Sequence, residues 1–111
     1  MEYRLPFPPS TNNLFINKGR RRVLSLEYRL WREAAAWELK AQKAKPFKGR
    51  AIVHIDIDDT RKGDADNRSK AILDALVEYG VLAGDSKKHV RRVSVGWERI
   101  SGCRVAIGEA A

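Results

Sequence analysis

Two aspartates separated by one residue, Asp64 and Asp66, stand where a strand-like run of the sequence gives way to a helix-like run. Lys70 follows one helical turn later, and Asp85 lies in the loop expected after that helix. Oxygen atoms are the ligands that Mg²⁺ prefers, and few carboxylates are needed because the ion keeps several waters. The pattern therefore predicts a metal site with Asp64, Asp66 and Asp85 as ligands and Lys70 as a catalytic cation beside them.

The charge of the whole chain supports this interpretation. It has 22 Lys and Arg against 14 Asp and Glu, a net charge of +8, which favours a polyanionic partner such as nucleic acid. Clustered carboxylates repel one another, by about 1 kcal/mol per pair or more, and they also repel a phosphate. A divalent cation reverses both effects, polarises the scissile phosphate and lowers the pKa of a bound water. The pattern favours a metal-dependent nuclease.

The same residues also have a purely structural interpretation. Aspartates at a helix start are often only caps, a lysine on a helix commonly pairs with acids four residues away, and positive charge can simply maintain solubility. On that interpretation the chain is a non-catalytic, basic nucleic-acid-binding module. A calcium EF-hand is excluded, because a loop beginning at Asp64 has Ser69 where glycine is needed and Ala75 where the final acid is needed.

Other chemistries and locations find little support in the sequence. The single cysteine, Cys103, excludes an intrachain disulfide and a cysteine-rich zinc site, and we expect it to be a small buried side chain. His54 and His89 lack partners for a metal or nucleophilic site, so a structural role is favoured. The chain begins without a signal-peptide pattern and contains no apolar run of the ~20 residues needed to span a bilayer. We expect a cytoplasmic protein without a membrane partner.

The periodicity of apolar residues predicts a single α+β domain over residues 1–111, in the order β-α-β-α-β-β, with a small mixed sheet packed by two helices. Prolines at positions 6, 8 and 9 place the first strand at an edge or end it. The last two strands are expected to form a hairpin across residues 100–102. The predicted strands cover 2–7, 50–58, 89–98 and 103–108, and the predicted helices cover 26–43 and 66–79.

Each element has a predicted buried face. The first helix is expected to bury the stripe Leu26, Leu30, Ala34, Trp37 and Ala41. Core or interface packing is favoured for Trp31 and Trp37 over a role as base-stacking platforms. The second is expected to bury Ile72, Leu73, Leu76 and Tyr79 and to present Asp66, Asn67, Lys70 and Asp74 on its opposite face. The second strand is expected to separate Ala51, Val53, Ile55 and Ile57 from Ile52, His54, Asp56 and Asp58.

Three stretches together resemble the RusA family of Holliday junction resolvases, small prophage-associated endonucleases. The first is Leu-Pro-Phe-Pro-Pro-Ser-Thr-Asn-Asn at residues 5–13. The second is Asp-Ala-Asp-Asn at residues 64–67, followed by Lys70 and by Asp-Ala-Leu at residues 74–76. The third is Gly80 followed by Asp85. Together with the order of the predicted elements they cover most of the chain, and in combination they are quite specific.

The resemblance implies a homodimer whose two active sites, each requiring Mg²⁺ or Mn²⁺, nick two strands of a four-way junction symmetrically. It assigns Asp64, Asp66 and Asp85 as metal-binding catalytic acids and Lys70 as an essential basic residue. Two departures are visible: Ala65 replaces a usual leucine, and Gly84 stands where the family often has a second acid. Asp74 matches a family position, but it also fits a structural role.

The dense positive run at residues 18–22 is a candidate phosphate clamp, although such runs are commonly solvated loops. Within the resemblance, the residues expected to contact DNA are Asn12, Asn13, Lys18, Arg20, Arg21, Arg22, Lys87 and Lys88, with Arg91 and Arg92 as further candidates. Their contacts to phosphates are sequence-independent and salt-dependent. Selectivity for a junction would then come from shape and dimer geometry. A nuclease for other branched DNA is a related alternative.

Overall fold

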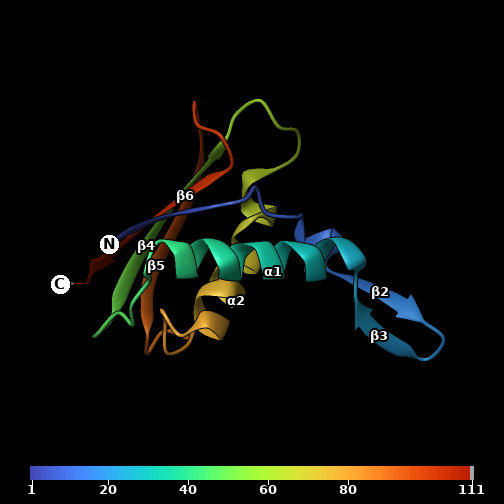
Figure 1. Ribbon diagram of the computed structural model, residues 1–111, viewed down its shortest axis with the longest axis horizontal. Coiled ribbons are helices and arrows are strands. Elements are labelled where there is room, and N and C mark those ends of the chain that lie inside the picture. The colour runs from blue at the N-terminus through green and yellow to red at the C-terminus, as the bar shows by residue number, and fades with distance from the viewer. Residues whose placement is uncertain (111) are drawn as a thin grey trace.

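A four-stranded mixed sheet in the spatial order β1-β6-β4-β5 forms the centre of the computed structural model, which describes residues 1–110 (Figure 1). Its strands are β1 (Glu2–Leu5), β4 (Ala51–Asp58), β5 (Val90–Glu98) and β6 (Cys103–Glu109). Two helices, α1 (Leu26–Ala41) and α2 (Ser69–Tyr79), lie on one face of this sheet (Figure 1). The predicted α+β class, the mixed sheet and the order of its elements are confirmed, whereas Ala111, the last residue of the predicted domain, lies outside the described residues.

The other elements are two short 3-10 helices and a second small sheet. The 3-10 helices are η1 (Thr11–Asn13) and η2 (Ala65–Asn67), and the small sheet is the antiparallel hairpin of β2 (Phe15–Lys18) and β3 (Arg21–Leu24). The hairpin was not predicted, because residues 10–22 are polar and basic and lack a buried face. It projects from the body of the molecule beyond the start of α1 (Figure 1).

Local signals determine where the helices begin and end. The Ser25 hydroxyl accepts a hydrogen bond of 3.1 Å from the Tyr28 backbone N–H and so caps α1, as expected for a serine at this position. Gly80 ends α2 with φ 98°, a conformation that glycine adopts without steric cost. The start of α2 differs from the prediction, because residues 65–67 form η2 and the α-helix begins only at Ser69.

The predicted hairpin between the last two strands is wrong. β5 pairs in parallel with one edge of β4, and β6 pairs antiparallel with the other edge and also with β1. The short link between β5 and β6 instead passes the end of β4, where the Asp58 N–H donates to the Gly102 carbonyl. β4 is the most apolar strand, and this arrangement gives it hydrogen-bonding partners on both edges.

The predicted buried stripe of α1 is also wrong. Leu26, Leu30 and Trp37 are 57–64% exposed, and the two alanines predicted with them are exposed as well. The helix instead buries a second stripe at helical spacing, which consists of Tyr28, Trp31, Ala35 and Leu39. This stripe contains two large aromatic side chains that bury a large apolar area, and the Trp31 indole N–H also donates to the Pro6 carbonyl. The core packing predicted for Trp31 is confirmed, whereas Trp37 is exposed and does not pack in the core of this chain.

The core lies between the helices and the sheet. From β4 it contains the predicted alternating set, Ala51, Val53, Ile55 and Ile57, all fully buried. From α2 it contains Ala71, Ile72, Ala75 and Leu76, whereas Leu73 is half-buried and Tyr79 is 37% exposed, contrary to prediction. Cys103 is buried as expected, and burial raises the pKa of its thiol to about 12. Among the described residues, no helix is long and apolar enough to cross a membrane.

Candidate metal and nucleic-acid site

The turn that carries Asp64 and Asp66 follows the carboxyl end of β4. Thr60 begins this connection by donating backbone and hydroxyl hydrogen bonds of 2.9 and 2.7 Å to Oδ1 of Asp58, and these bonds lower the pKa of that carboxyl group. Asp64 is the residue before η2, but its side chain makes no capping hydrogen bond. Both carboxylates are exposed, and within residues 1–110 neither forms an ion pair. The capping interpretation therefore has no support at Asp64.

Lys70 and Asp74 lie on the first two turns of α2 and contact each other. The Lys70 Nζ is 3.3 Å from Oδ2 of Asp74, and the lysine side chain is half exposed. The same carboxylate oxygen accepts a 3.3 Å hydrogen bond from the hydroxyl of Tyr28 on α1. Burial, and after it the charge of Asp74, raises the pKa of Tyr28 to about 12. Asp74 thus has a structural role, since it joins the two helices and holds Lys70.

The N-terminal proline loop, residues 6–10, brings the two predicted asparagines next to the acidic turn. The Thr11 hydroxyl donates a 2.9 Å hydrogen bond to the backbone carbonyl of Asn67, directly after Asp66. Thr11 also begins η1, which contains Asn12 and Asn13 and leaves both side chains exposed. Residues more than fifty positions apart in the sequence therefore meet at this site.

Asp85 lies at the opposite end of β4 from the Asp64–Asp66 turn. Its loop follows the far end of α2 and contacts the first residues of β4, because the Ala51 N–H donates to the His89 carbonyl and Arg50 Nε donates to the Lys87 carbonyl. The Asp64–Asp66 turn follows the opposite end of β4. This strand has eight residues, so its two ends are roughly 20 Å apart. Among the described residues, no group of three His, Cys, Asp or Glu side chains is placed to hold a metal ion.

Gly84, where the family resemblance leads us to expect a second acid, is closely packed. A Cβ atom at this position would lie 2.7 Å from Cδ2 of the His89 ring. An acidic side chain at position 84 would therefore require the His89 ring to move, and Asp85 is the acid that this loop presents.

Besides Asn12 and Asn13, the eight residues predicted to contact DNA comprise two basic groups. Lys18, Arg20, Arg21 and Arg22 lie exposed on the β2–β3 hairpin, where the Arg22 guanidinium is 4.4 Å from the Phe15 ring centroid. Lys87 and Lys88 are exposed on the same loop as Asp85, at the other end of α2. One chain therefore carries two separate positive regions, of which the second shares its loop with Asp85.

His54 has the structural role that the sequence predicts. It lies on the sheet face opposite the helices, with Nδ1 at 2.6 Å from the Ser94 hydroxyl and Nε2 at 3.0 Å from Oδ1 of Asp56. Asp56 is only 6% exposed, and its other oxygen accepts two hydrogen bonds from Arg104, of 2.9 and 2.7 Å. These contacts satisfy a buried carboxylate and occupy both ring nitrogens.

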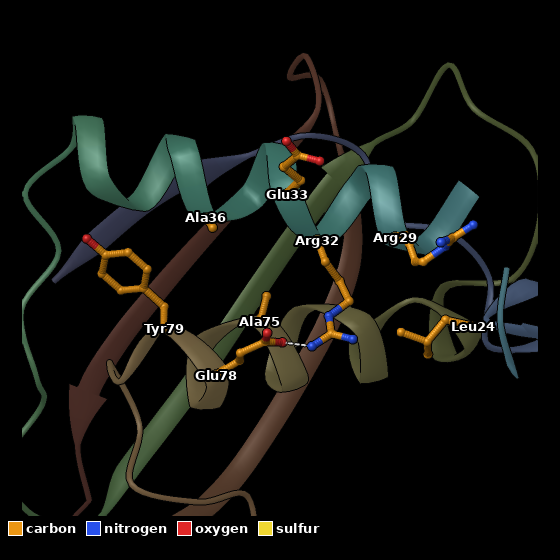
Figure 2. Close-up of a pocket in the computed structure, with 8 residues that line it drawn as sticks. All are labelled: Leu24, Arg29, Arg32, Glu33, Ala36, Ala75, Glu78 and Tyr79. Atoms are coloured by element: carbon orange, nitrogen blue, oxygen red, sulfur yellow. Dashed lines mark hydrogen bonds and ion pairs between the residues drawn. The ribbon is translucent and has the colours of Figure 1, made fainter. Parts of the chain in front are cut away.

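A hollow of about 540 Å³ opens between α1 and α2 (Figure 2). Arg32 and Glu78 form an ion pair across it, as the dashed line in Figure 2 shows. Its lining residues are Leu24, Arg29, Arg32, Glu33, Ala36, Ala75, Glu78 and Tyr79. None of the predicted catalytic or DNA-contacting residues is among them, so this hollow is separate from the candidate site.

Sequence reasoning missed one residue that the structure places at the site. Arg68 lies between Asp66 and Lys70, and its guanidinium donates to backbone carbonyls of Pro8 and Lys62. The sequence contains no local signal for these contacts, because an arginine at a helix start reads as an ordinary surface residue and Pro8 lies sixty positions away.

Comparisons with known proteins agree with the motifs. A family model described as Endodeoxyribonuclease RusA matches residues 6–107. The crossover junction endodeoxyribonuclease rusA of Enterobacteria phage HK97 is 28% identical over 109 residues, which cover 96% of this chain and 90% of the phage protein. Proteins of the same description from Enterobacteria phage 82 and Escherichia coli (strain K12) are each 33% identical over 88 residues, which cover 75% of this chain and 72% of each relative.

Proposed function

The chain belongs to the RusA family of endodeoxyribonucleases, and we propose that it resolves four-way DNA junctions in the cytoplasm by metal-dependent hydrolysis of phosphodiester bonds. The match over residues 6–107 and the names of the curated relatives support this proposal. The net charge of +8 suits a substrate that brings several duplex arms together. The acids and the lysine that the resemblance marks as catalytic are present at the expected spacing.

The proposed metal dependence is supported by the two carboxylates of the Asp64–Asp66 turn. Both carboxylates are exposed and unpaired within residues 1–110, in a chain that contains 22 cationic side chains. Oxygen donors of this kind, completed by water, fit Mg²⁺ or Mn²⁺. Asp64 and Asp66 would hold the ion, which when bound polarises the scissile phosphate and activates water.

Lys70 would act on the charge that develops on the phosphate during cleavage. Its contact with Asp74 restricts the side chain without burying it, because the lysine side chain remains half exposed. A cation held in advance near the reacting group needs little reorganisation when negative charge develops. The role proposed for Lys70 is therefore electrostatic stabilisation of the transition state.

We further propose that a second copy of the chain completes each active site. Asp85, Lys87 and Lys88 lie on a loop at the end of β4 opposite the Asp64–Asp66 turn, so one chain does not gather the three acids. In a homodimer with two-fold symmetry, each protomer presents the same surfaces to the other. The Asp85 loop of one protomer would then meet the Asp64–Asp66 turn of its partner, and two such sites would cut two strands.

Incubation of a labelled four-way junction with the protein, with and without EDTA, tests the proposed activity. We expect paired nicks that require Mg²⁺ or Mn²⁺, and we expect Asp66→Asn to abolish them. The same variant should bind the junction at least as tightly as the wild type in EDTA, because it removes one negative charge from the DNA-binding face. Cleavage by Asp66→Asn at the wild-type rate would refute the assignment, and equal cutting of flaps and junctions would favour a general branched-DNA nuclease.

A further inference from the structure

The Arg68 guanidinium joins two segments that are far apart in the sequence. Its Nη1 donates a 2.9 Å hydrogen bond to the carbonyl of Pro8, in the N-terminal proline loop. Its Nη2 donates a 3.0 Å hydrogen bond to the carbonyl of Lys62, at the start of the acidic turn. A guanidinium has several N–H donors in one rigid plane, so two carbonyls bound to it are also held at a defined separation.

An aromatic ring adds to this anchor. The centroid of the Phe7 ring lies 5.0 Å from the Arg68 guanidinium carbon and 4.6 Å from that of Arg61. Such a contact attracts a cation to the ring face. Phe7 precedes Pro8, so the ring and the carbonyl that Arg68 contacts come from adjacent residues of the same loop.

The turn fits closely around the arginine. Gly63 has φ 114°, and a Cβ atom there would lie 2.6 Å from Nη2 of Arg68. The Nε atom of Arg68 is buried and has no hydrogen-bond partner within residues 1–110. Burying such a donor costs free energy, which a solvated surface arginine would not incur. These features distinguish Arg68 from the exposed arginines of the β2–β3 hairpin.

The hydrogen-bond partners of the Arg68 guanidinium matter for the neighbouring acids. Arg68 is two residues from Asp66, yet it forms no ion pair within residues 1–110 and contacts neutral carbonyls instead. The carboxylates of the turn therefore remain available to a cation. Arg68 also directly precedes α2, the helix that carries Lys70.

From this geometry we propose that Arg68 is a positioning residue of the nuclease site. It fixes the turn carrying Asp64 and Asp66, and the start of α2 carrying Lys70, against the N-terminal proline loop. This role rests on the proposed function, since it concerns how tightly the turn binds a divalent ion. Arg68 itself contacts neither the ion nor the scissile phosphate.

The test compares Arg68→Gln and Arg68→Lys with Arg61→Gln, a control that removes the same charge above the same ring without touching the carbonyl anchor. Mn²⁺ affinity is measured by electron paramagnetic resonance, together with the thermal midpoint and junction binding in EDTA. We expect both Arg68 variants to bind Mn²⁺ about tenfold more weakly, in keeping with the loss of a charge-assisted hydrogen bond. Arg61→Gln should bind Mn²⁺ as the wild type does, and all three variants should keep their junction affinity within about threefold.

Arg68→Lys is the informative variant if Arg68→Gln folds poorly, because lysine keeps the charge but cannot bridge two carbonyls with a planar fork. Wild-type Mn²⁺ affinity in Arg68→Lys would show that charge alone suffices and would overturn the positioning role. A lower thermal midpoint with unchanged Mn²⁺ affinity would overturn it as well. A wild-type protein that binds no Mn²⁺ would refute the metal site itself, and the positioning role with it, which separates that failure from the other two.

Discussion

The hydroxyl of Tyr28 on α1 and the carboxylate of Asp74 on α2 form a hydrogen bond of 3.3 Å. Oδ2 of Asp74, the atom that accepts this bond, is also 3.3 Å from Nζ of Lys70. A core side chain of one helix therefore positions, through a single carboxylate, the cation proposed to act on the phosphate. Asp74 is part of the family motif, and this contact supplies a physical reason for an acid at that position.

Replacing Asp74 with asparagine tests this relationship. Asparagine keeps the shape and can still accept from Tyr28, but it loses the charge that attracts Lys70. We expect the free energy of unfolding to fall by about 1 kcal/mol or less, because the ion pair is half exposed. The rate of junction cleavage should fall by more than this loss of stability accounts for, because Lys70 is no longer held in place. Urea unfolding and single-turnover cleavage measure the two effects, and Glu27→Gln, at an exposed acid on α1, is the control.

Alkaline pH is expected to destabilise the protein through Tyr28. Burial raises the pKa of this phenol to about 12 in the folded chain, against about 10 in the unfolded chain. Between these values the unfolded state has released the proton and the folded state retains it, so stability falls as pH rises. The loss reaches roughly 3 kcal/mol at most, since each pKa unit corresponds to about 1.4 kcal/mol. Tyr28→Phe removes this contribution, and its urea unfolding should therefore depend less on pH between 10 and 12 than that of the wild type.

Mixed dimers test whether Asp85 acts across a subunit interface. Asp66→Asn and Asp85→Asn homodimers should each fail to cleave a junction. After the two are mixed and allowed to exchange subunits, a shared site predicts recovered nicking. One of the two sites then combines Asp66 of the Asp85→Asn subunit with Asp85 of the Asp66→Asn subunit, so both acids are intact there. The other site carries both substitutions. Gel analysis of the labelled strands detects the recovered nicks.

The mixed-dimer experiment has a clear contrary outcome. If each site were built from one chain, every site in the mixed dimer would contain a substitution, and no nicking would return. Subunit exchange is verified independently by mass spectrometry of differently tagged chains. Exchange without recovered nicking would exclude the proposed contribution of Asp85 from the partner.

The β2–β3 hairpin is expected to contribute to DNA affinity through phosphates. Replacing Arg20 and Arg21 together by glutamine should weaken junction binding and reduce the slope of log affinity against log salt by about 2, because each phosphate contact contributes about 0.9. The thermal midpoint should not change, since both side chains are exposed. In the matched control, the exposed lysines Lys45 and Lys48 are replaced by glutamine. This variant loses the same amount of positive charge, but far from the hairpin. An equal loss of affinity in both variants would mean that only net charge matters.

Local signals in the sequence were sufficient for several elements. The alternation in β4, the serine cap before α1 and the glycine after α2 each involve a few consecutive residues, and each prediction is confirmed. The buried face of α1 was not predictable in this way, because the helix carries two apolar stripes. Leu26, Leu30 and Trp37 form one and Tyr28, Trp31 and Leu39 the other, and only the shape of the surface beneath the helix selects between them.

The sequence by itself determined the class of chemistry and the family. The pair Asp64 and Asp66, with Lys70 one turn later, lies within seven residues, so local chain geometry keeps these groups together in any fold that forms the turn and the helix. The tertiary structure alone decided that Asp85 lies beyond the other end of β4, that β6 separates β4 from β1, and that Arg68 binds the carbonyl of Pro8. These relationships depend on the path of the chain between distant residues, and that path follows from how the whole core packs.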